Sequence, residues 1–224
     1  METTYIEIDS PDKHLSDVLE EIPSNVILYK TLTGIGATYS EIKAQRHSII
    51  IEPNVPVIIG KCNSDKHKND NLLGVYEGVT TDRIIKYLGA SRGKYYKILT
   101  TPESFTKVKD AFLIFNGKIY NTCFLLIDEA HKTIKDVDYR SDIVLPMNDF
   151  FKFKGKALVS ATPLKFSDPR FEENGFSIIK IEPTYDYAKE IDIKPSTNIL
   201  REVWEEFGWM PFITGQGKDN PYFI

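Results

Sequence analysis

Phe-Leu-Leu-Ile-Asp-Glu-Ala-His, residues 124–131, is the stretch of this sequence that decides the fold. Its first four residues are apolar and predict a strand buried on both faces, and two adjacent carboxylates, Asp128 and Glu129, follow where that strand emerges. Continuous apolar strands are typical of a sheet covered by helices on both sides, the parallel arrangement of α/β proteins. Because ligands of such sheets bind at the carboxyl ends of the strands, the acidic pair also indicates where a site would lie.

Short apolar and β-branched runs alternate with helical segments along most of the chain. The predicted strands are residues 25–29, 48–52, 72–76, 96–100, 123–128, 156–160 and 177–181. The predicted helices are residues 15–22, 38–45, 80–88, 102–115 and 142–151. An alternating series of this kind predicts a doubly wound, mainly parallel sheet with helices on both faces.

The adjacent carboxylates suit the hydrolysis of a nucleoside triphosphate, which needs two acidic groups with different tasks. One holds Mg²⁺, usually through water, and the other orients or deprotonates the attacking water. Because adjacent side chains on a strand point to opposite faces, we expect the two roles to separate, with Asp128 serving the metal and Glu129 the water. A solvated Asp-Glu turn after a core strand is the alternative interpretation.

A second apolar strand ends in Ser-Ala-Thr-Pro, residues 160–163. Asp-Glu-Ala-His resembles the Walker B motif of DEAH-type helicases of superfamily 2, and Ser-Ala-Thr resembles motif III of the same DEAD/DEAH-type family. The resemblance implies a RecA-like (P-loop NTPase) fold, an ATP site with Mg²⁺ and translocation on nucleic acid. It also implies that His131 couples the two motifs by contacting Ser160 and Thr162. A capping or packing histidine is the alternative.

The stretch Tyr-Lys-Thr-Leu-Thr-Gly-Ile-Gly-Ala-Thr-Tyr-Ser-Glu, residues 29–41, lies where a phosphate loop belongs, between a strand and a helix. Gly34 and Gly36 can expose backbone N–H groups to an anion at the start of that helix. Thr38 can supply a hydroxyl ligand for Mg²⁺. The family has Gly-Lys-Thr at this point, whereas this sequence has alanine, Ala37, in place of the lysine that neutralises the β- and γ-phosphates.

Three interpretations of this loop are open. In the first, the site hydrolyses ATP with a cation from elsewhere, for which Lys30 at the end of the preceding strand is the nearest candidate. In the second, it binds nucleotide without useful turnover. In the third, the loop is vestigial. The acidic pair favours the first, because catalytic carboxylates have little use in a dead site. An exposed strand-end lysine is the alternative for Lys30. No glutamine precedes the loop as in DEAD-box helicases, so the sequence does not indicate selectivity for adenine.

Two stretches resemble the family's motifs for nucleic acid, residues 49–54 for motif Ia and residues 99–104 for motif Ib. The resemblance implies that Asn54, Thr101 and Ser104 hold the sugar–phosphate backbone, which needs N–H and hydroxyl donors rather than base-specific groups. The expected partner is nucleic acid, with DNA expected rather than RNA. Thr101 and Ser104 also fit an ordinary helix start.

The composition of the chain argues against several other classes of protein. The formal net charge of −4 gives no global basic footprint, so a nucleic-acid partner has to use local groups such as the basic clusters at residues 61–68 and 92–97. Two cysteines without a Cys-x-x-Cys pair argue against a disulfide scaffold or a four-cysteine zinc site. No secretory signal is visible, and no apolar run approaches the roughly 20 residues that span a bilayer. We expect a cytoplasmic protein without a membrane partner.

The chain divides into an N-terminal segment (residues 1–22), a RecA-like ATP-binding lobe (23–183), and a linker with the start of a truncated second lobe (184–224). A helicase-type motor closes its site between two lobes, and the second supplies an arginine. We therefore expect a second lobe in the full-length chain and little ATPase activity from these 224 residues alone. The predicted function is a nucleic-acid-dependent ATPase. A catalytically silent RecA-like module that binds nucleic acid or a partner protein is the alternative, and a phosphotransferase is disfavoured because it has no use for Ser-Ala-Thr.

Overall fold

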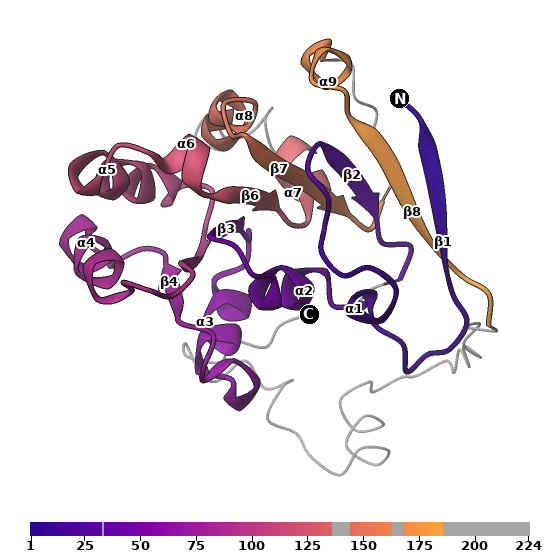
Figure 1. The fold of residues 1–224 in the computed structure, drawn as a ribbon, viewed down its shortest axis with the longest axis horizontal. Helices are drawn as coiled ribbons and strands as arrows, with labels where there is room; N and C mark the ends of the chain where they lie inside the picture. Colours follow the sequence, from indigo (N-terminus) through magenta and orange to yellow (C-terminus); the bar gives the residue numbers. More distant parts are fainter. Residues whose placement is uncertain (33, 136–143, 163–167, 186–224) are drawn as a thin grey trace, which may run out of the picture. The chain divides into compact units, whose positions relative to one another are not determined.

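One sheet of eight strands runs through the part of the chain that the structure describes, and all of its neighbouring strands are parallel (Figure 1). The structure is a computed structural model, and it describes residues 1–32, 34–135, 144–162 and 168–185, within one compact unit, Met1–Asp186. The strands lie in the order β1-β8-β2-β7-β6-β3-β5-β4. Their bounds are β1 (Thr3–Ile8), β2 (Val26–Tyr29), β3 (Ser48–Ile51), β4 (Leu72–Val75), β5 (Lys97–Thr100), β6 (Phe124–Ile127), β7 (Gly155–Ser160) and β8 (Ser177–Pro183).

Helices cover both faces of this sheet. Their bounds are α1 (Leu15–Val18), α2 (Ala37–Lys43), α3 (Val55–Asn63), the 3-10 turn η1 (Asp65–His67), α4 (Thr81–Ala90), α5 (Phe105–Phe115), α6 (Ile119–Thr122), α7 (Ala130–Lys135), α8 (Val144–Phe150) and α9 (Arg170–Glu173). Figure 1 shows α5, α6 and α8 above the sheet and α1, α2 and α3 below it. None of the described helices is long and apolar enough to cross a membrane.

The apolar core has two layers because side chains alternate along each strand. On β3, Ile49 and Ile51 pack into the layer that includes buried residues of α4, α5 and α8. Ile50 points the other way, into the layer that includes Leu15 of α1 and Ile58 of α3. Both layers are buried, which confirms the predicted α/β class, a mainly parallel sheet with helices on both faces.

The seven predicted strands are present as β2 to β8, each within two residues of its predicted ends. The edge strand β1 was not predicted, so residues 1–22 contribute a strand to the sheet, where β1 pairs with β8. Most of β1 is not buried, and its polar residues do not form the apolar run by which the other strands were predicted.

Helix α3 was also not predicted; its proline lies in the first turn, where a missing N–H costs nothing. Residues 186–224 of the predicted linker and second-lobe start (184–224) lie outside the described residues, as does the first part of the predicted helix 142–151.

The strand order places three predicted segments at one edge of the sheet. Because all the strands are parallel, the residues that follow β2, β6 and β7 leave the sheet at the same edge. β7 lies between the other two, with Ser160 opposite Tyr29 of β2 and Leu158 opposite Ile127 of β6. The loop after β2 and the acidic pair after β6 therefore stand on either side of the end of β7.

Candidate functional site

A cavity of about 430 Å³ lies at the carboxyl ends of β2, β3 and β6. Its lining combines the loop after β2, the start of α2, the wall of α3 and the residues after β6. The lining residues are Lys30, Gly34, Ile35, Gly36, Ala37, Thr38, Glu52, Asn54, Val57, Lys61, Asp128, Glu129 and Lys132. The two segments predicted to form a phosphate site thus face one another across a shared cavity.

The loop after β2 depends on two glycines. Gly34 and Gly36 have φ angles of 80° and 86°, in the left-handed region that costs other residues energy. A Cβ atom at Gly34 would meet nothing within 4 Å, so this position requires glycine for its backbone conformation and not for lack of space. Ala37 follows as the first residue of α2 and also lines the cavity.

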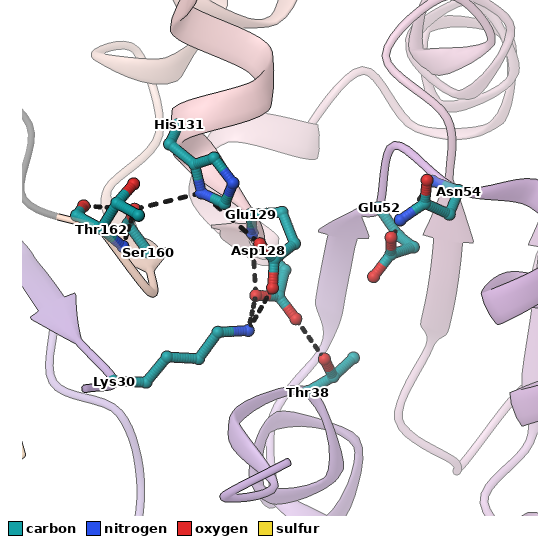
Figure 2. A network of polar contacts seen from close by, with 9 residues as sticks. All are labelled: Lys30, Thr38, Glu52, Asn54, Asp128, Glu129, His131, Ser160 and Thr162. Carbon is teal, nitrogen blue, oxygen red and sulfur yellow. Dashed lines mark hydrogen bonds and ion pairs between the residues drawn. The ribbon is translucent and has the colours of Figure 1, made fainter. Parts of the chain in front are cut away.

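Lys30 lies inside the site and is only 8% exposed. Its Nζ lies 3.0 Å from Oδ1 of Asp128 and 2.6 Å from Oε1 of Glu129 (Figure 2). Burial opposes the charge of this ammonium, but the attraction of both carboxylates outweighs it, and the pKa of Lys30 is raised above its ordinary value. Lys30 is therefore not an exposed strand-end lysine. It is a charged group placed between the two carboxylates.

Asp128 also contacts α2, the helix that follows the loop after β2. Oγ1 of Thr38 donates a hydrogen bond to Oδ2 of Asp128, and the backbone N–H of Glu129 donates to Oδ1 at 2.8 Å. The strand ends at Ile127, and Glu129 has a φ of 49°, a left-handed conformation that is uncommon for residues other than glycine. Because of this turn, Asp128 and Glu129 reach the same ammonium. The expectation that they point to opposite faces is therefore wrong.

Thr38 and Asp128 fit a magnesium ion. Their oxygen atoms are in direct contact, and Mg²⁺ is usually held by one or two carboxylates together with substrate phosphates and water. Among the described residues, no three His, Cys, Asp or Glu side chains form a group that could hold a metal ion.

His131 joins Glu129 to the end of β7. Nδ1 of His131 lies 3.3 Å from Oγ of Ser160 and 3.4 Å from Oε2 of Glu129. The Ser160 hydroxyl donates to the carbonyl of Thr162 at 2.7 Å. Since a hydroxyl has one hydrogen, Nδ1 has to be the donor in its contact with Ser160. The expected contact between His131 and Ser160 is thus present, and its coupling role stays a prediction.

Of the three residues predicted to bind nucleic acid, one lines the cavity and two are buried elsewhere. Asn54 lines the same cavity as the phosphate loop. Thr101 and Ser104 are both buried, and Oγ1 of Thr101 accepts the backbone N–H of Ser104 at 3.3 Å in the turn before α5. Their contact with a sugar–phosphate backbone stays a prediction, and the burial of the two hydroxyl residues does not support it.

The basic cluster at residues 92–97 is only partly available to a partner. Lys97 is buried, and its ammonium donates to the backbone carbonyls of Glu41 and Ala44, at 2.7 Å in each case. Burial lowers the pKa of Lys97 to about 8. Lys97 therefore satisfies carbonyl groups at the end of α2 and does not contribute charge to a surface.

Glu52 is a residue of the site that the sequence analysis did not single out. It is 3% exposed and lines the cavity. Burial, together with the negative charge of Asp128, raises the pKa of Glu52 to about 7. A signal was present, because Ile-Ile-Ile-Glu at residues 49–52 repeats the pattern of Leu-Leu-Ile-Asp at 125–128, an apolar strand that ends in a carboxylate.

No model of a known protein family and no curated protein sequence matches this chain. Among solved structures, it is similar to a hypothetical ATP-dependent RNA helicase from Sulfolobus tokodaii, with 16% identity and a TM-score of 0.48 over 70% of this chain and 48% of that one. It is also similar to the Hef helicase domain from Pyrococcus furiosus, with 14% identity and a TM-score of 0.48 over 77% of this chain and 38% of that one. The chain therefore spans less than half the length of either structure. At identities this low, the similarity does not indicate a function for this chain. The function has to be argued from the geometry of the chain's own residues.

The raised pKa of Glu52 predicts a pH-dependent effect of Glu52→Gln on stability. Between the ordinary pKa of 4.5 and the raised value of about 7, the folded chain holds a proton that the unfolded chain releases, so the Glu52 contribution to stability falls as pH rises. Replacement by glutamine should increase the free energy of unfolding by roughly 3 kcal/mol at pH 8 and by less than about 1 kcal/mol at pH 5. Denaturant unfolding in metal-free buffer at both pH values measures this.

The matched control is Glu77→Gln, which removes a charge from an exposed glutamate outside the cavity lining. It should have no effect at either pH. Equal destabilisation by Glu52→Gln at pH 5 and pH 8 would mean that Glu52 makes a stabilising contact unrelated to its ionisation, and the pKa assignment would be wrong.

Proposed function

We propose that this chain is the RecA-like, ATP-binding lobe of a nucleic-acid-dependent ATPase of the helicase type. The observation that carries the proposal is the convergence of Lys30, Thr38 and the pair Asp128–Glu129 on one cavity. Hydrolysis of a nucleoside triphosphate needs a cation for the phosphates, oxygen ligands for Mg²⁺ and a group that orients the attacking water. Each of these needs has a matching side chain in the cavity.

Lys30 is the proposed substitute for the lysine that the phosphate loop lacks. The usual lysine would extend into the cavity from the position of Ala37, and the ammonium of Lys30 enters the same cavity from the end of β2. Its raised pKa keeps it charged at neutral pH. A lysine side chain is long and flexible, so its Nζ can leave the carboxylates for the β- and γ-phosphates of ATP when these enter.

The carboxylates then take the roles assigned from the sequence. Thr38 and Asp128 would hold Mg²⁺, which supplies positive charge at the phosphates when bound. Glu129 orients the attacking water and accepts its proton, and His131 positions Glu129 through the contact of Nδ1 with Oε2. In the present arrangement Lys30 is 2.6 Å from Glu129. The water-orienting carboxylate therefore becomes available only when the phosphates draw Lys30 away.

Nucleic acid, DNA rather than RNA, is the proposed partner, and a second RecA-like lobe of the full-length protein is proposed to complete the site in the cytoplasm. The support is the resemblance of the Asp-Glu-Ala-His and Ser-Ala-Thr motifs to helicase motifs, together with the contact between His131 and Ser160 that joins them. A helicase-type motor closes its site between two lobes, and the second supplies an arginine. Turnover is therefore expected only from a protein that includes the second lobe.

If Lys30 does the work of the lysine that is missing at position 37, a second substitution should rescue its loss. Lys30→Ala should weaken the binding of ATP with Mg²⁺ by about 10- to 100-fold, since hydrogen bonds to charged groups contribute roughly 1.5–3 kcal/mol. Adding Ala37→Lys to this variant should restore most of the affinity, because the new side chain reaches the same cavity. Titration of the chain with a fluorescent ATP analogue measures both.

The control variants for this experiment are Lys61→Ala and Lys132→Ala, which remove the other two lysines that line the cavity. Each should weaken binding less than Lys30→Ala. If Lys30→Ala bound the analogue as tightly as the wild type while one of the other variants lost binding, Lys30 would not be the phosphate-binding cation.

The assignment of Glu129 predicts a separation of binding from turnover. In a protein that includes the second lobe, Glu129→Gln should retain ATP binding and lower nucleic-acid-stimulated ATP hydrolysis by at least about 100-fold, the usual effect of losing a general base. Steady-state hydrolysis with and without single-stranded DNA or RNA measures this. Absence of turnover in the wild type, with no nucleotide-dependent change in melting temperature, would favour the catalytically silent module.

A further inference from the structure

Glu52 occupies on β3 the position that Asp128 occupies on β6. The two strands are parallel neighbours, and Ile51 lies opposite Ile127, so each strand is followed directly by a carboxylate at the same level of the sheet. Residues in register on neighbouring parallel strands point to the same face, with backbones about 4.8 Å apart. Both side chains enter the cavity on the face covered by α2 and α3 (Figure 2).

Glu52 and Lys30 approach Asp128 from opposite sides. In the sheet, β6 separates β3 from β7 and β2, so Lys30 arrives from the β2 side and Glu52 from the β3 side. Lys30 is held by Asp128 and Glu129. Within the described residues, the Glu52 side chain has no ion pair, and its one hydrogen bond is from the backbone N–H of Asn54 to Oε1, at 3.1 Å. Its other oxygen, Oε2, is the one that remains for a ligand in the cavity.

A purely structural role does not account for a carboxylate at this position. Burial of an acidic group without an ion pair destabilises a fold. Glutamine has nearly the same shape and could accept the same hydrogen bond from Asn54 without a charge. A residue that lowers stability and lines a site is characteristic of a functional group. A carboxylate at this position is therefore explained by a ligand that donates a hydrogen bond to it.

We infer that Glu52 is a third carboxylate of the nucleotide site, a positioning residue that accepts hydrogen bonds from water molecules bound to Mg²⁺. The inference rests on the proposed function. It adds a residue that determines how much Mg²⁺ nucleotide binding requires. Mg²⁺ in nucleotide sites keeps several of its waters, which are strong donors. Carboxylates that hold such outer groups tune the affinity for the metal. Thr38 and Asp128 hold the metal from one side, and Glu52 holds its water on the side of β3.

The test is the Mg²⁺ dependence of nucleotide binding. A fluorescent ATP analogue is kept at a fixed concentration with the chain, Mg²⁺ is titrated, and binding in EDTA is measured separately. Glu52→Gln should raise the half-saturating Mg²⁺ concentration by about tenfold, while binding in EDTA stays unchanged or becomes tighter because a negative charge is lost. Glu52→Asp keeps the charge but shortens the side chain, and should fall between the two. Glu77→Gln should match the wild type.

The outcomes separate this inference from the proposed function. If the wild-type chain binds the analogue with Mg²⁺ and folded Glu52→Gln has the same Mg²⁺ requirement, the role of Glu52 is overturned and the proposed function stands. If Glu52→Gln weakens binding equally in Mg²⁺ and in EDTA, Glu52 acts on the nucleotide or on the fold, and the inference is again overturned. If the wild-type chain binds no nucleotide, both fail together.

Discussion

The ion pairs of one buried lysine with two carboxylates are the interaction on which the rest of the site depends. Asp128 and Glu129 follow an apolar strand and turn toward the same point, so without a cation between them their negative charges would repel each other. Lys30 supplies that cation from β2, across the end of β7. The ion pairs thus hold together two segments that lie almost a hundred residues apart in the sequence.

The same ion pairs define the state in which the site rests. With the ammonium between the carboxylates, the positive charge of Lys30 lies beside Asp128, where the positive charge of a magnesium ion is proposed to bind. In the proposed function, nucleotide binding would be an exchange in which Lys30 moves from the carboxylates to the phosphates, and Asp128 and Thr38 would hold the metal. Glu52 has no ion pair in this resting arrangement. In the proposed function, a water molecule on Mg²⁺ would donate to the Glu52 oxygen that has no hydrogen bond in this arrangement.

The fold and the centre of the site follow from local patterns, whereas the walls of the site do not. Apolar runs located β2 to β8, and the acidic pair, Thr38 and Lys30 were recognised because each stands at a strand end or helix start. The edge strand β1 was missed because most of it is not buried. Glu52 had a local signal, an apolar run that ends in a carboxylate, but its place beside Asp128 depends on the register of β3 against β6. The burial of Thr101 and Ser104 depends on how α5 packs, which no local pattern encodes.

A structure of the chain with Mg²⁺ and a non-hydrolysable ATP analogue tests the central claim most directly, because it identifies the cation on the phosphates. The account predicts that Nζ of Lys30 lies about 3 Å from a β- or γ-phosphate oxygen, with the metal beside Thr38 and Asp128. Lys30 still held between Asp128 and Glu129, with another lysine on the phosphates or the nucleotide bound outside the cavity, would contradict it.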